Sequence, residues 1–225
     1  MSLGVLTRRE GLALLSAAAL PGIAVAQGEP KVGRHFRKLR QRLASSGSKI
    51  EVVEFFWYGC PACNAFEPTL QAWVKQLPAT VEFRHVHIGG RAQQRPHQRL
   101  FFTLQAMGVE HQFRSAIFNA MHQQRNPLDT PEAMIKLLQP LGLDGAKFQS
   151  MWAALDPKAF SGAKIVQADK LTEAYELDGV PMLGIGGLYT TSPSQAAGGE
   201  PMSALEGGRR AVAVTEFLVR NFGKV

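Results

Sequence analysis

The apolar positions of the chain predict two strand-containing segments separated by a long helical one. Residues 50–58 are almost continuously apolar, which is typical of a β-strand buried on both faces of a sheet. The next apolar residues share one helical face that ends at Pro78, and residues 80–88 predict a second strand. Residues 50–88 are therefore expected to form a strand–helix–strand unit, in which parallel strands need a right-handed crossover.

From about residue 91 to residue 163 the pattern is wholly helical. Glycines separate successive helical faces, and Thr130-Pro131 is typical of an N-cap followed by proline in the first turn. A further helix is expected to begin at Asp156-Pro157 and to end near Leu177. Residues 91–163 therefore have the apolar pattern and the helix-ending residues expected of a small helical domain.

Strand signals return after residue 178. Two short strands are expected at residues 180–185 and 188–190, joined by a glycine turn. A loop at residues 192–199 and a last helix at residues 208–222 are expected to follow. The chain thus predicts an α/β fold in which an all-helical domain, residues 91–163, is inserted between two parts of one α/β domain, residues 27–90 and 164–225.

The first 26 residues predict a secretory signal peptide. Arginines at positions 8 and 9 precede an apolar stretch at 12–20, and small residues at 24 and 26 form a cleavage pattern. The apolar stretch is shorter than the roughly 20 residues that span a membrane. The paired arginines leave both the general secretory route and the twin-arginine route open. Either route leads to an oxidising compartment, where disulfides persist.

Composition and charge limit the kinds of partner that the chain is expected to bind. The chain has 225 residues, 45% of them hydrophobic, and a formal net charge of +7. A basic run at residues 31–42 could indicate nucleic acid or anionic lipid, but in an exported protein we interpret it as a solvated surface segment. We therefore expect no nucleic-acid partner, and a monomer is the default expectation.

The chain has two cysteines, which lie together as Cys60-Pro61-Ala62-Cys63 at a predicted strand-to-helix junction. This arrangement favours thiol–disulfide exchange, because a helix N-terminus stabilises a thiolate. Cys60 is expected to form the mixed disulfide with a substrate, and Cys63, one turn later, to resolve it. Pro61 suits the first helical position. A disulfide between residues three apart closes too small a loop to stiffen the fold much.

The alternative use of the cysteines is a zinc site completed by His85 and His87. The two histidines are two residues apart on a predicted strand and would share one face. The chain has no second CxxC, so we interpret them as solvent-facing strand histidines and expect neither a metal nor a cofactor.

Glu54 lies within the apolar strand, six residues before Cys60. It could face water from an edge strand, but we favour a buried carboxyl beneath the disulfide, able to exchange a proton with Cys63. Val180-Pro181 is a further candidate, although X–Pro bonds in folded proteins are cis in only about 5–6% of cases, so the sequence alone does not predict a cis bond.

Together these residues resemble the DsbA family of periplasmic thiol oxidases, within the thioredoxin fold. The resemblance extends from about Val32 to Phe222 and includes the position of the helical insertion. Its motifs are Glu54-Phe55-Phe56-x-Tyr58-x-Cys60-Pro61-Ala62-Cys63-x-x-Phe66-Glu67, Gly89-Gly90 and Gly179-Val180-Pro181.

The resemblance implies a thioredoxin fold with an inserted all-helical domain and a periplasmic location. It makes Cys60 the nucleophile, Cys63 the buried resolving cysteine and Glu54 the family's buried acid. It also makes Pro181 the cis-proline facing the disulfide, and gives Val180 a backbone that pairs with extended substrate.

The implied partners are folding proteins and a DsbB-like, quinone-linked inner-membrane oxidase. Trp57 and Tyr58 are expected to line the substrate groove with Val180. Two residues depart from the family pattern. Ala62 replaces a common histidine, which predicts a weaker oxidant. Glu82 occupies the place of a basic residue near the buried acid. Either Arg84, two residues on, substitutes for that residue, or the charge pair is missing.

Of three other functions considered, one is excluded and two remain open. An isomerase of this fold carries a preceding dimerisation domain, for which the segment before Cys60 is too short. A periplasmic disulfide reductase is compatible with Ala62. A peptide-binding or chaperone module would use the same groove without chemistry, and it alone would keep its function in a Cys60→Ala variant.

Overall fold

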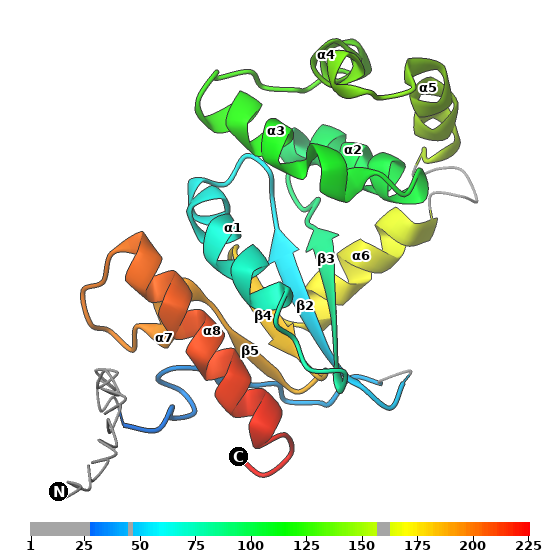
Figure 1. Cartoon of the computed structure of the whole chain (residues 1–225). Coiled ribbons are helices and arrows are strands. Elements are labelled where there is room, and N and C mark those ends of the chain that lie inside the picture. The colour runs from blue at the N-terminus through cyan, green and yellow to red at the C-terminus, as the bar shows by residue number, and fades with distance from the viewer. Residues whose placement is uncertain (1–27, 45–46, 157–162) are drawn as a thin grey trace, which may run out of the picture.

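A computed structural model describes residues 28–44, 47–156 and 163–225 (Figure 1). The predicted signal peptide, residues 1–26, lies outside these ranges. A helix was also predicted to begin at Asp156-Pro157; Asp156 is described, but residues 157–162 are not. Within the described residues, no helix is long and apolar enough to cross a membrane.

The centre of the molecule is a five-stranded sheet in the order β1-β5-β4-β2-β3. Its strands are β1 (Arg37–Lys38), β2 (Ile50–Phe56), β3 (Val81–His87), β4 (Met182–Ile185) and β5 (Tyr189–Thr191). The two strands of the predicted strand–helix–strand unit, β2 and β3, are parallel, and the remaining neighbours are antiparallel. The predicted strands at residues 50–58, 80–88, 180–185 and 188–190 are confirmed to within a few residues.

Both faces of β2 are buried, which explains its nearly continuous apolar sequence. Val52 packs with α1 (Pro61–Val74) and α8 (Ala204–Arg220), which lie side by side over one face (Figure 1). Val53 and Phe55 point to the opposite face, because successive residues of a strand alternate. There they share a core with residues of α6 (Ala163–Ala174).

The helical segment lies at the end of the sheet where β2 leads into α1 (Figure 1). It contains α2 (Arg95–Ala106), α3 (Glu110–His122), α4 (Pro131–Leu138) and α5 (Gly145–Ala154), with short 3₁₀ turns at Ala92–Gln94 and Gln139–Leu141. The predicted N-cap is confirmed, because the Thr130 hydroxyl accepts the backbone N–H of Ala133 at 3.2 Å. The fold is thus a thioredoxin-like sheet with a helical insertion.

Two local expectations were wrong and one was incomplete. The basic side chains at residues 31–42 are mostly exposed, as expected, but β1 within this run also pairs with β5. The predicted loop at 192–199 contains a short helix, α7 (Pro193–Ala196), capped by Ser192. The last helix begins at Ala204, earlier than predicted, because Ser203 and Glu206 form a capping box.

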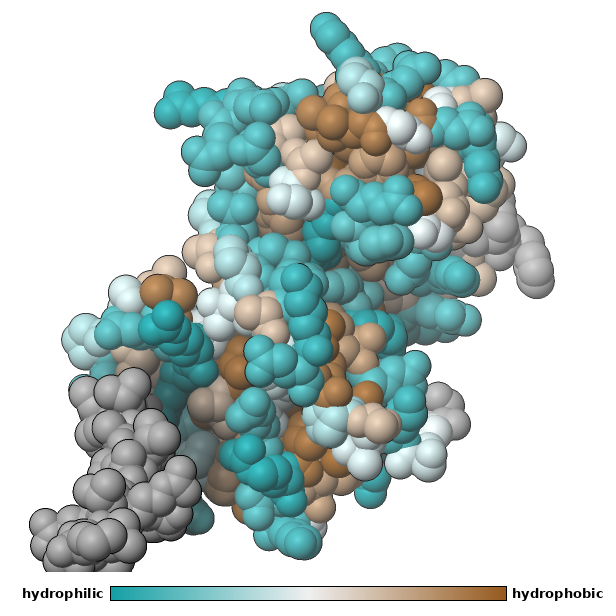
Figure 2. Space-filling model, in the orientation of Figure 1, coloured by the Kyte–Doolittle hydropathy of each residue, from teal (hydrophilic) through white to brown (hydrophobic). Residues whose placement is uncertain are grey.

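Figure 2 shows that apolar residues on the visible face form separate patches among hydrophilic ones.

Candidate active site

The two cysteines lie at the N-terminus of α1, as predicted. Cys60 is the N-cap residue with extended backbone angles, Pro61 follows in the first turn, and Cys63 lies one turn on. Cys60 has 9% of its surface exposed, whereas Cys63 has none. Both cysteines are free thiols. The strand, the loop and the helix start therefore hold Cys60 close to the surface and Cys63 fully inside the protein.

The surroundings of Cys60 stabilise its thiolate. The pKa of Cys60 falls to about 6, mainly because the Cys63 thiol donates a hydrogen bond to its sulfur. Burial opposes this lowering. The backbone N–H groups of Cys63 and Ala62 and the charge of His122 lower the pKa further. As a thiol, Cys60 lies 3.4 Å from the Val180 carbonyl and donates to it. Cys60 is thus ionised to a large extent at neutral pH.

The surroundings of Cys63 have the opposite effect. Burial raises the pKa of Cys63 well above its usual value, and its hydrogen bond to Cys60 and the negative charge of Glu54 raise it further. Cys63 therefore stays protonated where Cys60 is a thiolate. Since the thiolate is the nucleophile, this difference supports the predicted division of roles between the two cysteines.

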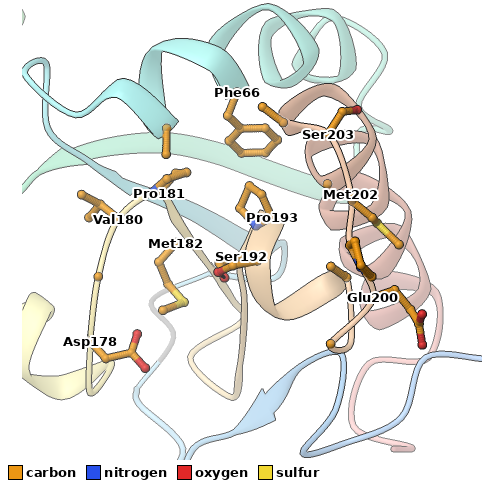
Figure 3. A pocket seen from close by; sticks show the side chains of 18 residues that line it. Phe66, Asp178, Val180, Pro181, Met182, Ser192, Pro193, Glu200, Met202 and Ser203 are labelled. Atoms are coloured by element: carbon orange, nitrogen blue, oxygen red, sulfur yellow. Dashed lines mark hydrogen bonds between the residues drawn. The ribbon is translucent and has the colours of Figure 1, made fainter.

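A groove runs beside the motif, with a volume of about 660 Å³ (Figure 3). Val180 and Pro181 lie at one end of it, with Phe66 of α1 above and Met182 of β4 below, and Ala62 also lines it. The Val180–Pro181 peptide bond is cis, as the family resemblance implied. The groove thus passes beside Val180, whose carbonyl is the hydrogen-bond partner of Cys60.

Trp57 and Tyr58 do not line this groove. The expectation that the Tyr58 side chain contacts a substrate is wrong, because its ring is fully buried and its hydroxyl donates to Glu110 at 2.6 Å. Trp57 lies in a separate pocket of about 520 Å³, where its indole N–H donates to Nδ1 of His97 at 2.8 Å. The two aromatic residues before the motif thus contact the helical segment and are not part of the groove lining.

Glu54 is fully buried, as predicted. Its Oε2 lies 2.6 Å from Nδ1 of His85 and 3.0 Å from a guanidinium nitrogen of Arg114. Among the described residues, its Oε1 has no hydrogen-bond partner. The basic residue that the family places beside the buried acid has no counterpart at position 82 or 84. Glu82 is acidic, and Arg84 pairs with Glu51 at 2.6 Å and not with Glu54. His85 and Arg114 occupy that role instead.

Arg114 of α3 connects three acidic side chains beneath the motif. It contacts Glu67 of α1 at 2.6 and 2.7 Å and Glu110 of its own helix at 3.2 Å, besides Glu54 of β2. Burial opposes its charge, yet these carboxylates raise the pKa of Arg114 above its usual value. The guanidinium also lies over the ring of Phe56, 4.1 Å from its centroid.

The sequence reasoning missed Arg114. Its signal was a charged residue on the apolar face of a helix, four residues before the buried Phe118. The residue joins the helical insertion to β2 and α1. The buried acid therefore depends on a cation that lies 60 positions away in the sequence.

The prediction that His85 and His87 face solvent is wrong. The His85 side chain is only 15% exposed, and its second nitrogen lies 3.2 Å from the Gln71 amide. His87 is fully buried; its Nε2 accepts the Tyr58 N–H and its Nδ1 lies 2.7 Å from the Ile88 carbonyl. Burial lowers the pKa of His87 well below its usual value.

These partners also answer the zinc alternative. The two histidines that would have completed the site are each bound to protein groups. Within the described ranges, no cluster of three or more histidine, cysteine, aspartate or glutamate side chains is arranged to hold a metal ion. The cysteines are therefore best explained by thiol chemistry.

A dithiol of unequal acidity at a helix start, facing a cis-proline on a mixed sheet, defines the class of thioredoxin-fold thiol:disulfide oxidoreductases. Comparison with known proteins narrows this class. The family model of the DSBA-like thioredoxin domain matches residues 51–207. The chain belongs to this family.

Named relatives agree. The chain is 37% identical over 184 residues to the thiol:disulfide interchange protein DsbA of Burkholderia cepacia, covering 80% of this chain and 85% of that protein. It is 38% identical over 189 residues to DsbA of Pseudomonas aeruginosa, covering 84% and 88%. The crystal structure of P. aeruginosa DsbA matches with a TM-score of 0.74 at 34% identity, covering 84% of this chain and 92% of that one.

A more distant structure shows the same architecture. The oxidoreductase NmDsbA1 from Neisseria meningitidis matches with a TM-score of 0.67 at 25% identity, over 88% of this chain and all of that one. The predicted fold class, family and enzyme class are thus confirmed.

Proposed function

We propose that the mature chain is a periplasmic dithiol oxidase that donates the Cys60–Cys63 disulfide to folding proteins. The observation that carries the proposal is the opposite shift of the two cysteine pKa values, to about 6 for Cys60 and well upward for Cys63. A stabilised thiolate favours the dithiol over the disulfide, so the disulfide form is an oxidant. The predicted signal peptide, residues 1–26, supports the periplasmic location.

The reaction takes two exchanges. A substrate thiolate attacks Sγ of Cys60, the Cys60–Cys63 bond breaks, and Cys63 leaves with the electron pair and takes up a proton. A second substrate thiolate then attacks the substrate sulfur of the mixed disulfide, and Cys60 leaves as a thiolate. The substrate loses two electrons and gains a disulfide; the enzyme becomes a dithiol.

Glu54 is the proposed proton carrier for Cys63. Its charge raises the pKa of Cys63, which requires the two groups to be close. Its Oε1 is unpartnered among the described residues, while Oε2 is held by His85 and Arg114. One carboxylate oxygen is thus fixed and the other is available to exchange a proton.

Pro181 and Val180 are proposed to present the substrate. They line the groove together with Ala62, which lies between the two cysteines in the motif, and the Val180 carbonyl accepts a hydrogen bond from Cys60. An extended peptide pairing beside Val180 would bring its own thiol to the same place. We propose that folding proteins and a DsbB-like, quinone-linked oxidase use this groove in turn, with the enzyme acting as a monomer.

The test is oxidative refolding of a reduced, unfolded disulfide protein by the purified oxidised chain without its first 26 residues. We expect stoichiometric transfer, with one substrate disulfide formed for each Cys60–Cys63 disulfide consumed. A chain that binds the unfolded protein but transfers no disulfide would instead be a peptide-binding module. A chain whose disulfide is retained in a glutathione buffer that keeps substrate thiols reduced would be a reductase.

A further inference from the structure

His122, the last residue of α3, contacts the loop that leads to the nucleophile. Its Nε2 donates to the Tyr58 carbonyl at 2.8 Å, and its ring stacks on Phe118. The Cys60 N–H closes the same loop by donating to the Trp57 carbonyl at 3.0 Å. The imidazole thus lies against the turn that carries Cys60, although it comes from the helical insertion.

Three histidines surround this loop, and they differ in their access to protons. His87 and His97 are buried, and burial lowers the pKa of each, so they are neutral at pH 7. His122 is only partly buried, and it lines the pocket of about 520 Å³ that also contains Trp57 and Gly59. It is the last residue of α3 and so lies at the negative end of the helix dipole.

The charged and titratable groups around these two side chains can be named. The pocket with His122 also contains His97, Arg125 and Asp129, from three different parts of the helical segment. Cys60 faces Cys63 on its own helix and the Val180 carbonyl from the sheet side. Ala62, between the two cysteines, contributes a backbone N–H but no side-chain charge.

We propose that His122 is a positioning residue for thiol exchange, whose protonated imidazole stabilises the Cys60 thiolate across the boundary between the two parts of the molecule. The charge that the motif lacks at Ala62 is thereby supplied by α3. In consequence the oxidising strength of the Cys60–Cys63 pair depends on pH through His122. The inference rests on the proposed oxidase function and adds a residue to its site.

The experiment compares two substitutions that both keep a hydrogen-bond donor for the Tyr58 carbonyl. His122→Gln removes the charge, and His122→Lys keeps a charge that does not titrate below pH 9. The control His111→Gln removes an exposed histidine from the first turn of the same helix. For each protein, the Cys60 titration is followed by thiolate absorbance at 240 nm, and the equilibrium with glutathione is measured between pH 6 and pH 8.5.

We expect His122→Gln to raise the pKa of Cys60 from about 6 and to reduce the equilibrium constant for oxidation of glutathione at pH 6 by roughly three- to tenfold, or half to one pKa unit. The ratio of wild type to His122→Gln should fall towards one by pH 8.5, because a histidine side chain carries charge only at the acid end of this range, and the Gln variant differs by that charge. His122→Lys keeps the wild-type value at pH 6 and exceeds it at pH 8.5. His111→Gln matches the wild type throughout.

Equal values for wild type and His122→Gln at pH 6 would overturn the inference. So would equal losses in the Gln and Lys variants, which would indicate a structural role. If His122→Gln does not fold, the comparison of His122→Lys with wild type at pH 8.5 still decides, because a charge effect requires the Lys variant to be the stronger oxidant. A wild-type chain that exchanges no disulfide with glutathione would instead remove the proposed function itself.

Discussion

The two sides of the CxxC motif are built in opposite ways. On the side of Cys60 the protein supplies hydrogen-bond donors, a surface groove and a loop fixed by neighbouring backbone contacts. On the side of Cys63 it supplies burial and a cluster of three carboxylates around one arginine. The first environment stabilises a thiolate and the second opposes one. The comparison indicates that the oxidising strength of the Cys60–Cys63 pair depends on how differently the protein stabilises the two thiolates.

The largest effect is expected from removing either sulfur. Cys60→Ala should abolish disulfide transfer, because the exposed nucleophile is lost. Cys63→Ala should also transfer no disulfide, because the Cys60–Cys63 bond cannot form. Its Cys60 thiolate can still attack a disulfide of a substrate, and without Cys63 to resolve it the mixed disulfide should accumulate, visible on non-reducing gels. Disulfide transfer that survives in Cys60→Ala would show that the cysteines are incidental.

The buried cluster can be broken by Arg114→Met, which keeps most of the volume and removes the charge. Three carboxylates would then share a buried site without their cation, and we expect the free energy of unfolding in urea at pH 7 to fall by about 3–5 kcal/mol. The matched control is Arg220→Met, which removes an exposed ion pair with Glu216 and should cost at most about 1 kcal/mol. Equal losses in the two variants would show that the cluster contributes nothing special.

Glu54→Gln tests the proton exchange on the Cys63 side. The substitution removes the charge that raises the pKa of Cys63, so that pKa should fall. Disulfide exchange should also slow by roughly tenfold or more, since positioned acid–base groups contribute at least that much. The control Glu51→Gln lies on the same strand and is paired with Arg84. Unchanged exchange rates for Glu54→Gln across pH 5–8 would remove its role.

Ala62→His is expected to have the smallest effect. A histidine between the cysteines adds positive charge to the Cys60 side and should make the pair a stronger oxidant in equilibrium with glutathione. A tenfold change in the equilibrium constant corresponds to about 30 mV or 1.4 kcal/mol, and we expect at most roughly that. A potential that stays constant or falls would show that charge near Cys60 does not set its redox strength.

The parts of the site that could be predicted are those encoded locally. Cys60 and Cys63 follow from a strand, a spacing and a helix start, and the burial of Glu54 follows from its apolar strand neighbours. The period of two correctly places His85 and His87 on one face of β3. It does not say what covers that face, and the helical segment buries His87 there.

The parts that could not be predicted depend on contacts between distant segments. Arg114 reaches Glu54 only because α3 packs against the end of β2 and α1, and no local pattern sets that docking. The same packing buries Tyr58, whose hydroxyl finds Glu110 from α3. Strand β1 has two residues, too few for any periodicity to show.

The equilibrium constant between the Cys60–Cys63 pair and glutathione at pH 7 tests the central claim most directly. The low pKa of Cys60 and the high pKa of Cys63 predict that the dithiol form is favoured, so the disulfide oxidises glutathione even when oxidised glutathione is in excess. A disulfide that persists when reduced glutathione is in excess would contradict the account, because the chain would then be a reductase.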